Sequence, residues 1–81
     1  MPRSLRSPRH RRLVELLIQY REESGPKQAE VAERLGRHQP FVSNIESGQR
    51  RIDVVELIEL AEVIGFDPSA LVRQIQDGEP D

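Results

Sequence analysis

The chain has 81 residues, of which 32% are charged and none is cysteine. This length allows one small domain with a single core. The absence of cysteine excludes disulfides, thiolate catalysis and cysteine-ligated zinc, and it permits a cytoplasmic location, which we expect. No apolar run approaches the roughly 18 residues that a membrane span requires, so we expect no membrane association.

The formal net charge of -2 hides an uneven distribution along the chain. Residues 1–51 carry eleven Lys/Arg and six acids, a net charge of +5, whereas residues 52–81 carry one Arg and eight acids, a net charge of -7. Because local charge matters more than the total, a pI near 5.7 does not exclude a nucleic-acid partner. The alternative interpretation of either half is a solvated surface.

The N-terminal region combines an arm and a helix. Residues 1–8 are rich in Arg, Ser and Pro, and we expect a flexible basic arm there. Ser7 and Pro8 are of the types preferred at an N-cap and at the first helical position, and Gly25 predicts the helix end. Four apolar residues between these signals follow the i, i+3, i+4, i+7 spacing of one helical face: Leu13, Leu16, Leu17 and Tyr20.

Two short helices are predicted next, at residues 28–35 and 39–47, and Gly36 and Gly48 follow them. Pro40 is tolerated because it lies in the first turn of its helix. Each helix is under about three turns and would be unstable alone. Two such helices joined by a short turn form a helix-turn-helix, whose second helix enters the DNA major groove. The predicted inward residues of the pair are Val31, Ala32, Leu35, Val42 and Ile45.

Two further helices complete the expected fold. Asp53 and Glu56 have the spacing of a capping box, which begins a helix that Gly65 ends, and Asp67-Pro68 begins the last helix. The predicted buried face of the first is Val54, Leu57, Ala61 and Ile64, and its predicted solvent side is Glu56, Glu59 and Glu62. The pattern therefore predicts an all-α domain of five helices over residues 9–76, followed by a disordered tail at 77–81.

The string "KQAEVAERLGRHQPFVSNIESGQRRIDVVELIELAEVIGFDPSAL" resembles the phage-repressor (Cro and repressor) helix-turn-helix proteins, also called the xenobiotic-response-element (XRE) family. The resemblance covers about residues 9–72 when the first helix is included. It implies a lambda-repressor-like fold, double-stranded DNA as the partner, and a bacterial or phage protein associated with the nucleoid.

The resemblance and the residue types together predict roles for several residues of the second and third helices and of the turns beside them. Gln39 would read a base, since a Gln amide matches adenine N6 and N7, while Gln28 would brace Gln39 and contact phosphate. Phe41 and Asn44 lie three residues apart, so we expect them to share a helical face that is not the face of Val42 and Ile45, and Asn44 would read a second base from it. For Phe41 two alternatives stay open, a thymine methyl or packing on the preceding helix. The expected phosphate contacts are Arg37, His38, Ser43, Arg50 and Arg51, and for each of these polar residues a solvated surface is the alternative.

The resemblance also pairs Arg21 with Glu46 beneath the recognition helix, as a structural ion pair. Three positions depart from the family pattern: Lys27 and His38 replace better N-caps, and Pro40 removes a side chain that often reads bases. The basic residues near the N-terminus could compensate with DNA contacts of their own; they are Arg3, Arg6, Arg9, Arg11 and Arg12.

We expect no enzyme activity, cofactor or metal site, because no catalytic spacing is present and neither His10 nor His38 has a second ligand at metal spacing. The expected function is sequence-specific transcriptional regulation, as a repressor that binds a palindromic operator as a homodimer. The alternative is an antitoxin or another interaction module that neutralises a protein partner. Candidates for the dimer surface are Ile58, Phe66, Leu71, Val72 and Ile75.

Overall fold

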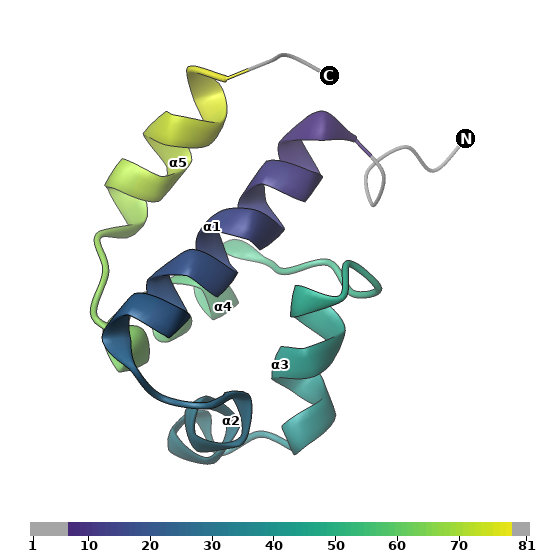
Figure 1. Ribbon diagram of the computed structural model, residues 1–81, viewed down its shortest axis with the longest axis vertical. Helices are drawn as coiled ribbons and strands as arrows, with labels where there is room; N and C mark the ends of the chain where they lie inside the picture. Colours follow the sequence, from purple (N-terminus) through teal and green to yellow (C-terminus); the bar gives the residue numbers. More distant parts are fainter. Residues whose placement is uncertain (1–6, 79–81) are drawn as a thin grey trace.

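The computed structural model describes residues 7–78, which form five α-helices and no strand (Figure 1). The helices are α1 (Pro8–Ser24), α2 (Gln28–Leu35), α3 (Gln39–Glu46), α4 (Val54–Ile64) and α5 (Pro68–Gln76). The expected all-α class and five-helix order are therefore confirmed. The predicted range of α3 was one residue too long, because Ser47 is its C-cap.

Local capping chemistry explains where α1 and α4 begin. The Ser7 hydroxyl accepts a hydrogen bond from the His10 N–H at 3.0 Å, and Pro8 stands at a position that needs no N–H donor. At α4, the Asp53 carboxylate accepts from the Glu56 N–H at 2.7 Å, and the Glu56 carboxylate accepts from the Asp53 N–H at 3.1 Å. Both starts agree with the sequence prediction.

The starts of α2 and α3 are capped less well, as the departures from the family pattern predicted. Neither Lys27 nor His38 makes a side-chain hydrogen bond that caps its helix. At α2 the Glu30 carboxylate accepts from the Lys27 N–H at 2.9 Å, which satisfies one backbone donor. These eight-residue helices therefore depend on packing against the rest of the domain.

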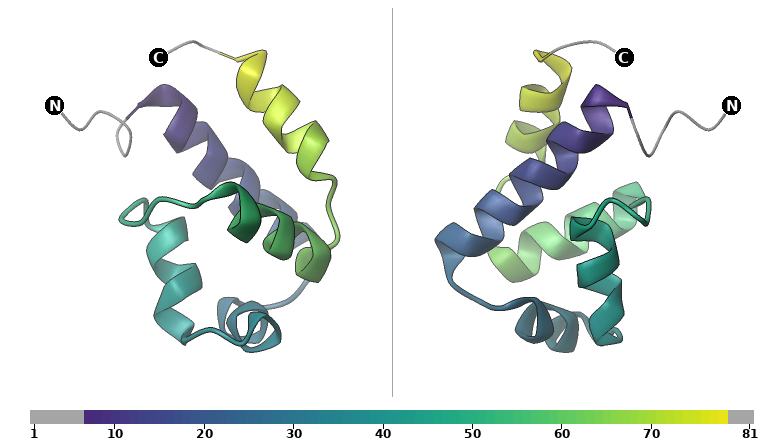
Figure 2. Two further views of the ribbon diagram at one scale, coloured as in Figure 1. Left: turned by 180° about the vertical axis from the view of Figure 1, so that it is seen from behind. Right: turned by 45° about the vertical axis from the view of Figure 1, so that its right-hand side comes forward.

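Helix α1 packs against three of the other helices, α3, α4 and α5. Helix α2 packs against α3 and α4, and α4 also packs against α5. Figures 1 and 2 show that α3 stands on the side of the molecule away from α5. Its inner side joins the single core, and its opposite side faces outward. The buried core residues are Leu16, Leu17, Val31, Ala32, Phe41, Val42, Ile45, Leu57, Leu60, Ala61, Ile64 and Leu71.

Two expectations about the last helices are wrong. Val54 is 71% exposed because it is the first residue of α4, and Leu60 lies inside in its place. Leu71 has no exposed surface and belongs to the core, so it is not a dimer contact. Phe66 is also engaged inside the domain, since its ring stacks on Tyr20 with the ring centroids 4.7 Å apart. Ile75 is partly buried against the same core.

The expected arm and tail fall partly outside the described residues. Residues 1–6 of the arm, including Arg3 and Arg6, and residues 79–81 of the tail lie outside the described range. Ser7 and Pro8, the last two residues of the expected arm, form the cap and first position of α1. Asp77, the first residue of the expected tail, is the C-cap of α5.

Candidate nucleic-acid interface

The second and third helices cross closely at small and apolar side chains. Val31 and Ala32 of α2 and Val42 and Ile45 of α3 are each 3% exposed or less. Gly36, with a φ of 70°, makes the left-handed turn between the helices, a conformation that costs glycine little. The Arg37 N–H then donates to the Ala32 carbonyl at 2.9 Å, which ends α2 and directs the chain into α3.

The outward side of α3 carries polar side chains and one proline. Gln39, Pro40 and Asn44 are exposed, as is His38 just before the helix. Pro40 and Asn44 are four residues apart and share a helical face. Ser43 is half-buried, and its hydroxyl donates to the Pro40 carbonyl at 3.3 Å. Gln39 and Asn44 therefore present amide groups outward, in a position to meet a partner along α3.

Glu46 connects α3 to α1 and α2 through hydrogen bonds to its carboxylate. Its carboxylate accepts from Arg21 at 2.6 Å (Nε to Oε2) and 2.9 Å (Nη2 to Oε1), so the expected pair lies in contact. Gln28 donates its amide to the same carboxylate at 2.8 Å. Arg21 also donates to the Pro26 carbonyl at 3.1 Å. The sequence associated Gln28 with Gln39, whereas in the structure its amide braces Glu46.

A second charged cluster lies at the other edge of α3, and the sequence reasoning missed it. Glu56 is only 7% exposed, so its assignment to the solvent side of its helix is wrong. Its two carboxylate oxygens each accept from Arg50 at 3.0 Å, and Arg37 lies 3.4 Å from Oε2. These arginines hold the pKa of Glu56 below its ordinary value of 4.5, with the Arg50 hydrogen bonds as the main cause.

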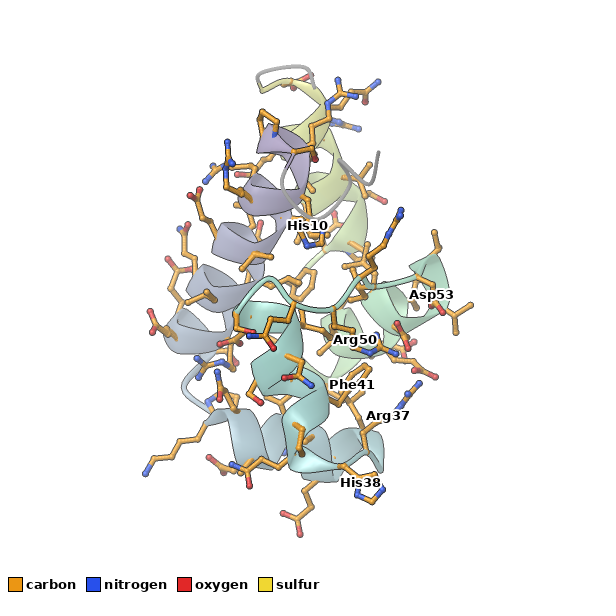
Figure 3. All side chains as sticks on the ribbon, turned by 90° about the vertical axis from the view of Figure 1, so that its right-hand side faces the viewer. His10, Arg37, His38, Phe41, Arg50 and Asp53 are labelled. Carbon is orange, nitrogen blue, oxygen red and sulfur yellow. The ribbon has the colours of Figure 1, made fainter. Side chains whose placement is uncertain are left out.

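Phe41 lies between the same two arginines. The guanidinium carbons of Arg37 and Arg50 stand 4.5 and 4.7 Å from the centre of its ring, within the range of a cation–π contact. Figure 3, which faces α3, shows the three side chains one below another along one edge of that helix. Phe41 is 9% exposed, so the alternative of packing inside the domain is the observed one. The spacing had predicted that Phe41 shares the outward face with Asn44, and this prediction is wrong.

The capping box was the sequence signal that could have placed Glu56. In such a box the N3 carboxylate turns back toward the start of the helix, here toward the loop that carries Arg50. The i, i+3, i+6 spacing of Glu56, Glu59 and Glu62 instead indicated one exposed acidic face. Capping chemistry therefore outweighed helical periodicity at the first turn of α4.

His10 lies near the loop that follows α3. Its Nε2 is buried and has no hydrogen-bond partner. Burial, and secondly the charge of Arg51, lower the pKa of His10 below its ordinary value of 6.5. The folded chain therefore favours the neutral imidazole more strongly than the unfolded chain does.

A fall in stability below neutral pH follows from this histidine. Because its folded pKa is depressed, its contribution to stability is complete above about pH 6.5 and is lost as the pH falls through the folded pKa. We expect the melting temperature to fall in this window, and the fall to be absent in His10→Leu. His38→Gln, at an exposed position, is the matched control. An identical pH profile for wild type and His10→Leu would contradict this.

The described residues offer neither a metal site nor a membrane span. Within residues 7–78 no three His, Asp or Glu side chains are grouped so that they could hold a metal ion. No helix in this range has both the length and the apolar character to cross a bilayer. The side chains exposed on the surface around α3 include the amides of Gln39 and Asn44 and the guanidinium of Arg37.

The five-helix fold and the outward helix α3 define a helix-turn-helix DNA-binding domain. The chain matches the helix-turn-helix domain family over residues 12–74. It is also similar to a solved structure described as an XRE-family like protein from Pseudomonas syringae pv. tomato str. DC3000, with 42% identity and a TM-score of 0.83. That alignment covers 89% of this chain and 88% of the other. No curated protein matches the chain.

The chain therefore belongs to the XRE-type helix-turn-helix family, as its sequence resemblance indicated. It is a DNA-binding regulator of this type.

Proposed function

We propose that this chain is a transcriptional repressor that binds a palindromic operator as a homodimer, with α3 in the major groove. The observation that carries the proposal is the pair of exposed amides, Gln39 and Asn44, on a helix whose other side is held in the core. An amide that donates and accepts together matches the N6 and N7 edge of adenine. Bound at its operator, such a protein would exclude other proteins from the same DNA.

Residues at the two ends of α3 would contact the DNA backbone. Arg37 and His38 precede the helix and Arg51 follows it, and all three are exposed. Hydrogen-bond donors at these places would hold the helix in register, because phosphate contacts position a protein without reading sequence. Ser43, half-buried on the same side, would add a hydroxyl contact. Gln28 would keep Glu46 in place and use its second amide N–H for phosphate.

A homodimer supplies the surface that one small module lacks. A single domain of this size buries too little DNA for tight selective binding, whereas two copies read two half-sites about 10 base pairs apart. The dimer would use exposed apolar residues of the last two helices. These large apolar side chains are Val54, Val55 and Ile58 on α4 and Val72 on α5.

Selection of duplexes from a random pool, followed by affinity measurements, tests the proposal. We expect Gln39→Ala and Asn44→Ala each to weaken binding to the selected duplex by about tenfold to a hundredfold, since a bidentate base contact contributes about 1–3 kcal/mol. Neither change should alter the melting temperature, because both side chains are exposed. Gln76→Ala, on the exposed surface of α5, is the matched control.

The selected sequences and the mass of the complex complete the test. We expect a two-fold symmetric consensus and a complex of two chains with one duplex. Unchanged affinity in both α3 variants would reject α3 as the reading helix. A single-chain complex on an asymmetric consensus would reject the homodimer and the palindrome.

A further inference from the structure

We propose that the two arginines that contact Glu56 at the edge of α3 have different roles. Arg50 is a positioning residue that fixes α3 and the loop after it, and Arg37 is the side chain that contacts phosphate. The inference rests on the proposed DNA binding and refines it, because the sequence predicted that both arginines contact phosphate.

Most of the hydrogen-bond donors of Arg50 are already used within the domain. Its Nη1 donates to the Arg51 carbonyl at 2.7 Å and to Glu56 Oε1 at 3.0 Å, which uses both hydrogens of that nitrogen. Its Nη2 donates to Glu56 Oε2 at 3.0 Å, and the guanidinium lies over the ring of Phe41. Three of its five donors are therefore committed inside the domain.

Moving Arg50 to DNA would leave Glu56 without its principal partner. The Glu56 side chain is 8% exposed, so water would replace the lost hydrogen bonds poorly. Its carboxylate is held in place by the Asp53 N–H at 3.1 Å, as part of the capping box of α4. Arg50 and Glu56 together therefore connect the loop after α3 to the start of α4.

Arg37 is held much more loosely. Its one ion pair among residues 7–78 is the 3.4 Å contact between Nη2 and Glu56 Oε2, whereas Arg50 makes three hydrogen bonds. The two arginine side chains are similarly exposed, at 40% and 37%, so the difference between them lies in these bonds. Figure 3 shows Arg37 in the turn directly before α3. With α3 in the major groove, the backbone of the duplex would run beside this turn. Arg37 can move to a phosphate while Glu56 keeps both hydrogen bonds from Arg50. Phe41, between the two, supplies a flat surface on which the guanidinium can turn.

The salt dependence of DNA affinity separates the two roles. Each phosphate contact adds about 0.9 to the slope of log affinity against log salt on B-DNA. We expect Arg37→Gln to lower the slope by about this amount per protomer, with little change in melting temperature. We expect Arg50→Gln to lower the melting temperature by at least about 4 °C and to leave the slope unchanged.

A pair of lysine variants covers the case in which Arg50→Gln does not fold. Lysine keeps the charge and serves as a phosphate contact, but it cannot form the two-point pair with a carboxylate. Arg37→Lys should therefore resemble wild type. Arg50→Lys should melt lower and should lose roughly tenfold of the preference for the selected duplex over a scrambled one, comparable to one base contact.

Either of two results would overturn the inference while leaving the proposed function intact. The first is that Arg50→Gln lowers the slope of the salt dependence as Arg37→Gln does. The second is that Arg50→Lys has the wild-type melting temperature and the wild-type preference for the selected duplex. If the wild-type chain bound no duplex with a salt-dependent affinity, the proposed function itself would fail, and the inference with it. The two failures are therefore distinguishable in the same titration.

Discussion

Replacing Glu46 with alanine is expected to lower the melting temperature by roughly 10 °C or more and to weaken DNA binding in the same variant. The Glu46 side chain is 8% exposed and Arg21 is 13% exposed, so the change leaves a partly buried guanidinium without its carboxylate. Breaking a buried pair in this way costs about 3–5 kcal/mol. In a domain of this size, each kcal/mol shifts the melting temperature by about 4–8 °C.

The loss of DNA affinity has a separate geometric reason. Glu46 is the last residue of α3, and its carboxylate binds Arg21 of α1 and Gln28 of α2. Without it, α3 loses its polar attachment to both helices, and the amides of Gln39 and Asn44 lose their fixed direction. Calorimetry and a binding titration measure the two effects on the same sample.

Matched variants identify the pair as the cause. Glu62→Ala, at an exposed position of α4, controls for the loss of a negative charge. In a double-mutant cycle, adding Arg21→Ala to Glu46→Ala should cost far less than Arg21→Ala alone, because the partner is already absent. A Glu46→Ala variant with unchanged melting and unchanged affinity would refute the role of the pair.

Replacing Leu71 with alanine is the second large effect that we expect, with a loss of about 2–5 kcal/mol of unfolding free energy. Leu71 has no exposed surface, and it joins α5 to the core. The deletion removes buried methyl groups and leaves a cavity that the neighbouring helices fill only in part. Chemical denaturation at several protein concentrations measures the change.

The neighbouring residue supplies the control for Leu71. Val72 is 49% exposed, so Val72→Ala should change the unfolding free energy by less than about 0.5 kcal/mol while remaining able to affect association. If Leu71→Ala altered the mass of the protein in solution but not its stability, Leu71 would be an interface residue and not a core residue.

The helices and their order could be predicted from local signals along the chain. The Ser7-Pro8 start, the Asp53–Glu56 box and the glycine at position 36 each act within a few residues, so their effect needs no knowledge of the rest of the fold. The family and the DNA-binding class were likewise readable, because the motif string is local and continuous.

Which charged and aromatic residues are buried could not be predicted in this way, because their burial depends on contacts between helices. Helical spacing placed Phe41 beside Asn44 and Glu56 beside Glu59, but the loop after α3 brings Arg50 over both Phe41 and Glu56. The choice between Leu71 and Val72 depended in the same way on how α5 lies against α1. In a domain of short helices, one residue can contact two neighbouring elements. The orientation of those elements cannot be predicted from the sequence pattern of any one helix.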